Sequence, residues 1–290
     1  MLRDRALTVR ELAASDLPAM RRLMSTSEYL YCRFGPEELP RLLACKPGVA
    51  AFSGPALQAF LLTNILAPPS AWLGGFGVIW SEGHRFERYL DLLLPTYSAA
   101  VRRAGARALY YTGGDLDSDW LKATLLARQF GLLTTLRSYD KEDFSIPAEG
   151  NQQIIVRPFQ RADLNELLEV ENACFDQYWC YDAASFLEIA ETYPYFVVAV
   201  RDGRVVGYQF NTVDGGMGFL VRIAVHPALN SQGIGARLMA EAVHFFQGQR
   251  VWKIALNTEE QNHHAHRLYE WFGFHQVQPQ GFVLERLLVG

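Results

Sequence analysis

Alternating apolar and polar segments in the second half of the chain predict an α/β domain. Glycine-containing turns at 202–203 and 215–216 separate three apolar segments, which is typical of strands connected by hairpins. Apolar residues at helical spacing follow Gly233. The predicted order is strands at 195–200, 205–213 and 219–225, a helix from 233, a strand at 251–256, a helix at 262–272 and two short strands to the end. This order is typical of a mixed sheet flanked by helices.

The first half of the chain has a similar order, with strands predicted at 49–52, 57–65, 72–80 and 108–112 and a helix at 85–103. Two short motifs also recur. Val9-Arg10-Glu11-Leu12 followed by Asp16-Leu17 returns 147 residues later as Val156-Arg157-Pro158-Phe159 followed by Asp163-Leu164. Phe130-Gly131-Leu132 returns 142 residues later as Phe272-Gly273-Phe274. Each match alone is weak, but the same order at nearly the same offset indicates a duplication.

A turn-rich segment, 145–151, separates the two halves. The sequence therefore predicts two domains, 1–147 and 152–290, each with a mixed, mainly antiparallel sheet flanked by helices. A chain of 290 residues is long enough for two such domains.

Composition narrows the classes of function. The net charge of −4 excludes the broad basic surface that non-specific nucleic-acid binding requires. The apolar runs are strand-sized, and the charged N-terminus shows no signal peptide. Cys32, Cys45, Cys174 and Cys180 form no C-x-x-C pair and are expected to be free thiols in a reducing compartment. The expectation is a soluble cytoplasmic protein without a membrane or nucleic-acid partner.

The segment that follows the strand at 219–225 has the features of an anion site. The strand ends at His226-Pro227, and Ser231-Gln232-Gly233-Ile234-Gly235-Ala236 then opens a helix. Free N–H groups at a helix start attract anions, and glycines let the backbone approach a phosphate closely. The loop is neither a dinucleotide fingerprint nor a Walker loop. Taken alone, its glycines are equally compatible with tight packing.

A second segment makes the assignment specific. Ile254-Ala255-Leu256-Asn257 is followed by Asn262, Ala265, Leu268, Tyr269 and Phe272-Gly273-Phe274. Together with the glycine loop, this segment resembles the GNAT acetyltransferase superfamily. A weaker similarity to its N-terminal-amine acetyltransferase branch extends over 170–179.

The resemblance implies acetyl-CoA as co-substrate and a role for each matching residue. Ile223, Ala224 and Val225 match the strand that splays from its neighbour and binds the pantetheine arm. Ser231, Gln232, Gly233, Ile234, Gly235 and Ala236 match the pyrophosphate loop, and Asn262 matches a contact to the coenzyme arm. Tyr269 matches the tyrosine that protonates the departing thiolate, a role that a positioned phenol can fill. Outside this motif, Tyr269 would be interpreted as a core residue.

The chain departs from the family pattern at two positions. Asn230 stands where Arg or Gln is usual. Asn257 stands where some relatives carry a catalytic glutamate, and asparagine cannot act as a base. Glu171 and Asp214 are candidates, but no base is assigned. His263, His264 and His266 are interpreted as a polar, solvated helix start, and no metal is expected because a Glu or Cys partner set is missing. His226 is interpreted as structural.

The first half lacks the glycine loop, because Ser81-Glu82-Gly83-His84-Arg85-Phe86-Glu87 stands in its place. It is expected to be a degenerate, non-catalytic domain, in a tandem layout similar to that of mycothiol synthase. The expected activity is acetyl transfer from acetyl-CoA to a primary amine of a small molecule or peptide. The loop Tyr178-Trp179-Cys180-Tyr181 either lines an acceptor pocket or packs between helices. A non-catalytic acyl-CoA sensor is the alternative. The acyl-chain length is open, and a tandem chain favours a monomer over a dimer.

Overall fold

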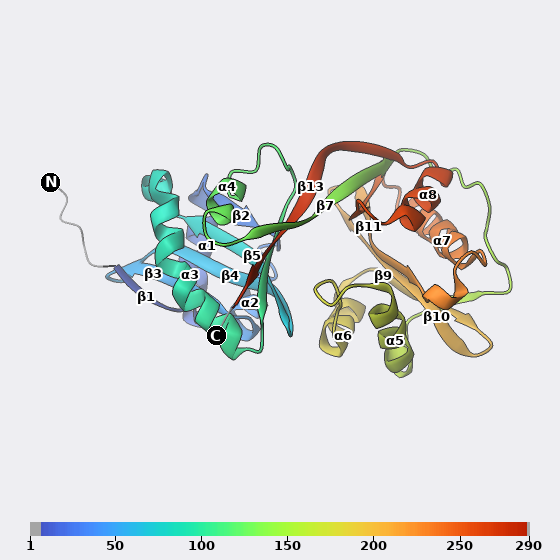
Figure 1. Ribbon diagram of the computed structural model, residues 1–290, viewed down its shortest axis with the longest axis horizontal. Helices are drawn as coiled ribbons and strands as arrows, with labels where there is room; N and C mark the ends of the chain where they lie inside the picture. Colours follow the sequence, from blue (N-terminus) through green and yellow to red (C-terminus); the bar gives the residue numbers. More distant parts are fainter. Residues whose placement is uncertain (1–6, 289–290) are drawn as a thin grey trace. The chain divides into compact units, whose positions relative to one another are not determined.

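The structure, a computed structural model, describes residues 7–288 and divides into two compact units. The N-terminal unit comprises residues 7–113, 119–133 and 283–288, and the C-terminal unit comprises 114–118 and 134–282. These units differ from the expected domains 1–147 and 152–290 in the segments 114–118, 134–147 and 283–288. Two long strands, β7 (Gly131–Lys141) and β13 (His275–Leu287), have residues in both units (Figure 1).

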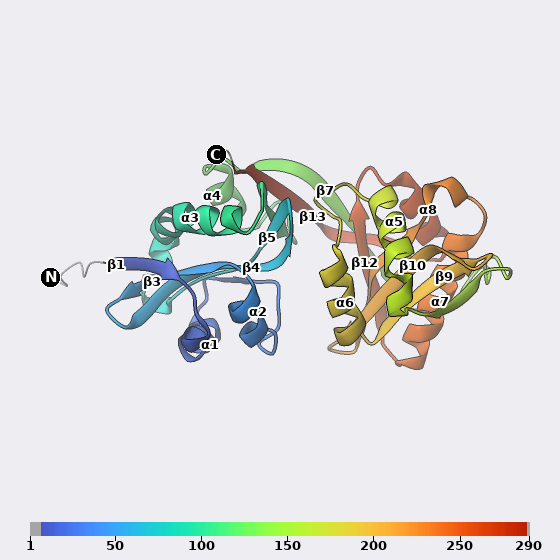
Figure 2. The same ribbon diagram turned by 90° about the horizontal axis from the view of Figure 1, so that it is seen from below.

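The N-terminal unit is a mainly antiparallel sheet in the order β1-β3-β4-β5-β6-β13, and β2 pairs with β5. Helices α1 and α2 lie on one face of this sheet and α3 lies on the other (Figure 2). A short α4 (Lys122–Leu126) precedes β7. The elements are β1 (Leu7–Glu11), α1 (Leu17–Thr26), β2 (Leu30–Cys32), α2 (Leu39–Cys45), β3 (Gly48–Ser53), β4 (Ala56–Ala67), β5 (Ser70–Val78), α3 (Phe86–Arg103) and β6 (Ala108–Gly113).

The C-terminal unit has the sheet order β13-β7-β12-β11-β10-β9-β8. Its elements are β8 (Ile155–Pro158), α5 (Leu164–Cys174), α6 (Ala183–Thr192), β9 (Tyr195–Arg201), β10 (Arg204–Asp214), β11 (Met217–Val225), α7 (Ile234–Gly248), β12 (Lys253–Glu259) and α8 (His263–Trp271). The predicted strands and helices of this half are confirmed within a few residues. One expectation is wrong: the two strands expected after Phe272 are the single strand β13. The neighbour of β12 on the side away from β11 is β7, which comes from the first half of the sequence.

The sheet of the C-terminal unit is buried on both faces. Leu167 and Val170 of α5 and Phe186 of α6 pack with Tyr208 and Phe210 of β10 on one face. On the other face, α7 and α8 cover the sheet with residues that include Met239, Val243, Phe246 and Phe272. Burying such large side chains contributes about 1.5–3 kcal/mol each relative to exposure. Both faces therefore fix the sheet, and with it the ends of β11 and β12.

The duplication inferred from the sequence has a structural counterpart. Arg10 pairs with Asp16 through two hydrogen bonds of 2.7 Å, and Arg157 pairs with Asp163 through two of the same length. Each aspartate also accepts a backbone N–H three residues before it, from Ala13 in one unit and Gln160 in the other. The first pair connects β1 to the start of α1 and the second connects β8 to the start of α5, which explains why these residues recur.

Candidate active site

The strands β11 and β12 separate at the centre of the C-terminal sheet. They pair in parallel only from Met217 to Phe219, opposite Lys253 to Ala255. Beyond these residues β11 keeps its partner β10 as far as Val225, and β12 keeps β7 as far as Glu259. A wedge-shaped gap therefore opens between the second halves of β11 and β12.

Backbone groups of β11 point into this gap. In an antiparallel pair, successive residues direct their N–H and C=O groups to opposite edges. The N–H of His226 bonds to the carbonyl of Val206 beside β10, at 2.9 Å. The N–H and C=O groups of Val225 and Ile223 therefore point away from β10 into the gap, while those of Ala224 point toward β10. The carbonyl of Val225 accepts a hydrogen bond from the Cys174 thiol at 3.2 Å.

The glycine loop lies at the open end of the gap and starts α7. Gly233 is the N-cap residue with φ +76°, a left-handed conformation that suits glycine, and Ser231 also has a positive φ of 63°. Asn151 holds this loop, because its side chain donates to the carbonyl of Gln232 at 2.9 Å and its backbone N–H donates to that of Gly233 at 3.1 Å. The N–H groups of Ile234, Gly235 and Ala236 belong to the first turn, which leaves them without an intrahelical acceptor.

A cleft of about 1030 Å³ follows the gap from the glycine loop to the loop between α5 and α6. Most of the residues proposed from the sequence line it. Gln232 does not, because its side chain accepts a hydrogen bond from Arg201 at 2.5 Å instead. The proposed residues that line the cleft are Ile223, Ala224, Val225, Ser231, Gly233, Ile234, Gly235, Ala236, Asn262 and Tyr269.

Tyr269 lies at the end of the second turn of α8 with only 4% of its surface exposed. Burial, and then the charge of the Tyr139 hydroxyl, raises the pKa of Tyr269 well above its usual value. In the part of the chain that the structure describes, no hydrogen bond to the Tyr269 hydroxyl is found. The side chain is therefore a protonated phenol in the wall of the cleft at neutral pH.

Glu171 is not a free base. It is fully buried, and Arg222 donates to its Oε1 at 2.8 Å, as does the backbone N–H of Tyr181, also at 2.8 Å. The Tyr208 hydroxyl donates to Oε2. Both oxygens are thus committed to structural bonds. The other candidate, Asp214, lies at the turn between β10 and β11 and does not line the cleft.

Arg222 links Glu171 to the loop between α5 and α6, which we call the aromatic loop (175–182). Its guanidinium lies 4.0 Å from the ring centre of Phe175 and 4.4 Å from that of Tyr181, and it donates to the carbonyl of Trp179 at 2.9 Å. Phe175, Asp176 and Trp179 line the cleft. The aromatic loop therefore does both things that the sequence left open: it packs against α5 and β11, and it lines the cleft.

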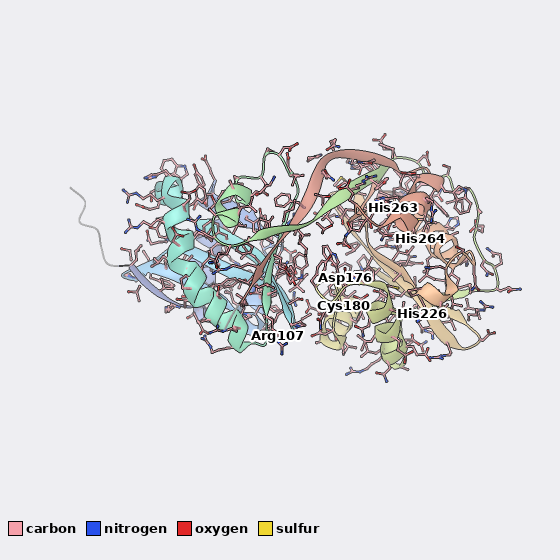
Figure 3. The ribbon with its side chains drawn as sticks, viewed as in Figure 1. Arg107, Asp176, Cys180, His226, His263 and His264 are labelled. Carbon is pink, nitrogen blue, oxygen red and sulfur yellow. The ribbon has the colours of Figure 1, made fainter. Side chains whose placement is uncertain are left out.

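The histidines of this unit differ in their surroundings, and Figure 3 labels His226, His263 and His264. His263 and His264 are exposed, but His266 is buried, so the expectation of a solvated cluster is wrong for that residue. Its Nε2 donates to the carbonyl of Glu260 at 2.9 Å, which leaves Nδ1 to accept from Tyr139 at 2.8 Å. His226 caps a short 3-10 helix (Pro227–Leu229), as a structural residue would. Burial raises the pKa of the Cys174 thiol to about 12.

The corresponding gap in the N-terminal unit is filled by the chain itself. There β5 and β6 also pair in parallel only at their starts, Ser70 to Trp72 with Ala108 to Tyr110, and Ser70 lies 147 positions before Met217. Beyond that point β2 pairs with β5, residue by residue from Leu30 opposite Gly77 to Cys32 opposite Gly75. Tyr31 and Arg33 then donate to the carbonyl of Thr112 on β6, at 3.0 and 3.1 Å.

The start of α3 also differs from the start of α7. The segment Trp80–Arg85 is a 3-10 helix, and the rings of Tyr29, Phe86 and Trp120 pack together beside it, with centroid distances of 5.1 to 5.8 Å. A Cβ atom at Gly83 would lie 2.2 Å from the Tyr29 ring. Aromatic side chains therefore occupy the place at which the other unit has its glycine loop.

Comparison with known proteins identifies the family. The model of the acetyltransferase (GNAT) family matches residues 159–274. An uncharacterised N-acetyltransferase of Methanocaldococcus jannaschii is 32% identical over 123 residues, which are 42% of this chain and 78% of that protein. The chain belongs to the GNAT acetyltransferase family, as its two motifs predicted.

Solved structures show that the tandem fold is shared over the whole chain. A GCN5-related N-acetyltransferase from Sphaerobacter thermophilus superposes with a TM-score of 0.66 at 16% identity, covering 100% of this chain and 98% of that one. A tandem GNAT protein from the clavulanic acid biosynthesis pathway, solved without AcCoA, gives 0.68 at 16% identity, covering 98% and 99%. At these identities the likeness concerns the fold alone.

Within residues 7–288, none of the helices is long and apolar enough to cross a membrane. The same residues contain no group of three or more His, Cys, Asp or Glu side chains arranged to hold a metal ion.

Proposed function

We propose that the protein is an N-acetyltransferase that moves an acetyl group from acetyl-CoA to a primary amine of a small molecule or peptide. The observation that carries this proposal is the gap between β11 and β12, which leads from the start of α7 to Tyr269 within one cleft. Binding groups for a diphosphate, for an amide-containing arm and for a leaving thiolate thus lie along one path.

The residues along this path fit acetyl-CoA in the order of its parts. The N–H groups of Ile234, Gly235 and Ala236 would hold the pyrophosphate at the helix start. The backbone groups of Ile223 and Val225 would pair with the amides of the pantetheine arm as a strand partner does. A Cβ atom at Gly235 would lie 3.4 Å from Leu268, so the fold itself leaves room there. The absence of a side chain at Gly235 would serve the approach of the phosphate.

The chemistry that follows is direct transfer. Bound acetyl-CoA supplies an activated thioester. The acceptor nitrogen attacks the carbonyl carbon, the C–S bond breaks, and the Tyr269 hydroxyl gives its proton to the departing sulfur. The Val225 N–H, which points into the gap, would stabilise the charge that develops on the carbonyl oxygen. The raised pKa of Tyr269 keeps that proton in place until the thiolate forms.

The N-terminal unit would bind no acyl-CoA, because β2 already pairs with the edge of β5 that the pantetheine arm would need. The aromatic rings beside the start of α3 likewise occupy the place of the pyrophosphate. We therefore expect one coenzyme site per chain. A non-catalytic acyl-CoA sensor is the second candidate, and Asn257 favours it, because asparagine in the wall of the cleft cannot accept a proton.

A thiol-release assay separates these two functions. Acetyl-CoA would be incubated with the protein and with n-butylamine, spermidine, tyramine, kanamycin or a short peptide with a free N-terminus. Free coenzyme A that appears only when protein, acetyl-CoA and an amine are all present supports the transferase. Binding of acetyl-CoA without release from any of these amines supports the sensor.

A further inference from the structure

Glu259 is the last residue of β12 and lies at the end of the cleft formed by the aromatic loop. Side chains alternate along a strand, and Ile254 and Leu256 point into the core beneath α7 and α8. Asn257 and Glu259 therefore share the opposite face of β12, and both line the cleft. The carboxylate of Glu259 thus lies on the same face of β12 as Asn257, two residues further along the strand.

The aromatic loop holds this carboxylate in place. The Tyr178 hydroxyl donates to Glu259 Oε1 at 2.6 Å, across 81 residues of sequence. Burial, and then this bond to Glu259, raises the pKa of Tyr178 above its usual value. The Tyr178 hydroxyl therefore stays protonated at neutral pH and donates its hydrogen bond to Glu259. Between residues 7 and 288, no hydrogen bond to the other carboxylate oxygen, Oε2, is found, which leaves that oxygen available to a ligand.

The charge at this end of the cleft is negative. Asp176 and Glu259 are the carboxylates among the lining residues, and Asp176 is close enough to Tyr178 to contribute to its raised pKa. The described residues include no Lys, Arg or His within salt-bridge distance of either carboxylate. Arg222, His264 and Arg267 also line the cleft. The charge of Arg222 is offset by Glu171, and Arg267 lies 3.0 Å from His264 on α8. The potential that a ligand meets here therefore favours a cation.

We propose that Glu259 binds the ammonium group of the acceptor and takes one of its protons, with Tyr178 as the residue that positions its carboxylate. This inference rests on the proposed function. The ammonium loses a proton to Glu259 and becomes a neutral amine, which attacks the thioester. Tyr269 protonates the departing thiolate, and the nitrogen gives up a second proton as the amide forms, which restores Tyr269. Glu259 returns the first proton to solvent, so transfer releases one proton overall.

The same charges select among acceptors. An amine without a neighbouring carboxylate meets attraction from both Asp176 and Glu259. A free amino acid carries a carboxylate beside its amine, and that group would be repelled by Asp176. The acceptor class is therefore a cationic amine, such as a polyamine, an aryl-alkyl amine or an amino sugar, in preference to a free amino acid.

The experiment compares Glu259→Gln with Asp214→Asn, which removes an exposed carboxylate outside the cleft. Acetyl-CoA affinity is measured by calorimetry, and thiol release is measured with n-butylamine, spermidine, tyramine, kanamycin and glycine over pH 6 to 10. We expect Glu259→Gln to bind acetyl-CoA like the wild type and to lose about 10²- to 10⁴-fold in kcat/KM for the cationic amines. Tyr178→Phe should show a smaller loss, and Asp214→Asn none.

The outcomes separate the two proposals. Absence of acetyl-CoA binding by the wild type overturns the proposed function itself. Normal binding with unchanged kcat/KM in Glu259→Gln overturns the role of Glu259 alone. Binding of acetyl-CoA without release from any of the amines overturns the transferase itself, and glycine as the best acceptor overturns the role of Glu259.

Discussion

Arg222 lies 2.8 Å from Glu171, and both side chains are buried, on β11 and α5 respectively. The pair connects the core to the aromatic loop, because Arg222 also contacts Phe175, Tyr181 and the Trp179 carbonyl. Removing one partner of a buried pair leaves an uncompensated charge, which costs about 3–5 kcal/mol.

The first prediction follows from this pair. Glu171→Gln should lower the free energy of unfolding by about 3–5 kcal/mol, as measured by urea denaturation. Glu169→Gln is the matched control, because Glu169 lies on the same helix and pairs with Arg204 at the surface, at 3.3 Å. Such an exposed pair contributes about 0–1 kcal/mol. Equal losses in the two variants would contradict the structural role of Glu171.

The second prediction concerns Tyr269. Tyr269→Phe should bind acetyl-CoA with nearly unchanged affinity and lower kcat about 10²- to 10⁴-fold. Because burial raises the pKa of Tyr269, the phenol stays protonated as the pH rises, so the wild type should show no basic limb from this residue below its ordinary pKa of about 10. A kcat that is the same in both proteins would remove Tyr269 from the mechanism.

The third prediction tests direct transfer. Cys174 lines the cleft, but burial, and then the charge of Glu171, raises the pKa of its thiol to about 12. A thiol that stays protonated at neutral pH is a poor nucleophile. Cys174→Ala should therefore keep its turnover within a few-fold of the wild type, and mass spectrometry after incubation with acetyl-CoA should find no acetyl group on Cys174. Iodoacetamide should modify the exposed Cys45 first. An acetylated Cys174 that transfers its acetyl group to an amine would contradict direct attack.

The fourth prediction uses the duplicated pairs. The bonds from Arg10 and Arg157 lower the pKa of Asp16 and Asp163 respectively. A lowered pKa in the folded state stabilises the protein above the unfolded value of about 3.9, and this stabilisation is lost as the pH falls below it. Asp163→Asn should cost about 1.5–3 kcal/mol at pH 7 and less at about pH 3, below the unfolded pKa, and Asp16→Asn should do the same. A cost that does not change with pH would argue against ionic capping.

The sequence predicted the parts of the site that are local. The strand 219–225, the proline that ends it and the glycine loop lie within one short segment. Their local sequence is therefore sufficient to predict their geometry. Tyr269 was found because its helix carries a spaced motif. The buried pair of Glu171 and Arg222 is separated by 51 residues, and a charged residue within an otherwise apolar strand was its only local sign.

Other features depend on tertiary packing that no local pattern reveals. Leu30 to Cys32 is a short segment, and only the vacant edge of β5 makes it a strand. His266 is buried because it shares the core-facing side of α8 with Tyr269, whereas His263 and His264 are exposed. Glu259 was overlooked because its significance comes from Tyr178, which is remote in the sequence. In each case the role of the residue is determined by a packing partner that is not adjacent to it in the sequence.

The most direct test of the account is a calorimetric titration of the protein with acetyl-CoA, repeated with Gly235→Glu. The fold leaves room at Gly235, but a carboxylate there would stand against the pyrophosphate. We predict saturable binding of one acetyl-CoA per chain by the wild type and loss of binding in the variant, with its thermal stability nearly unchanged. No binding by the wild type, two molecules per chain, or full affinity in Gly235→Glu would contradict it.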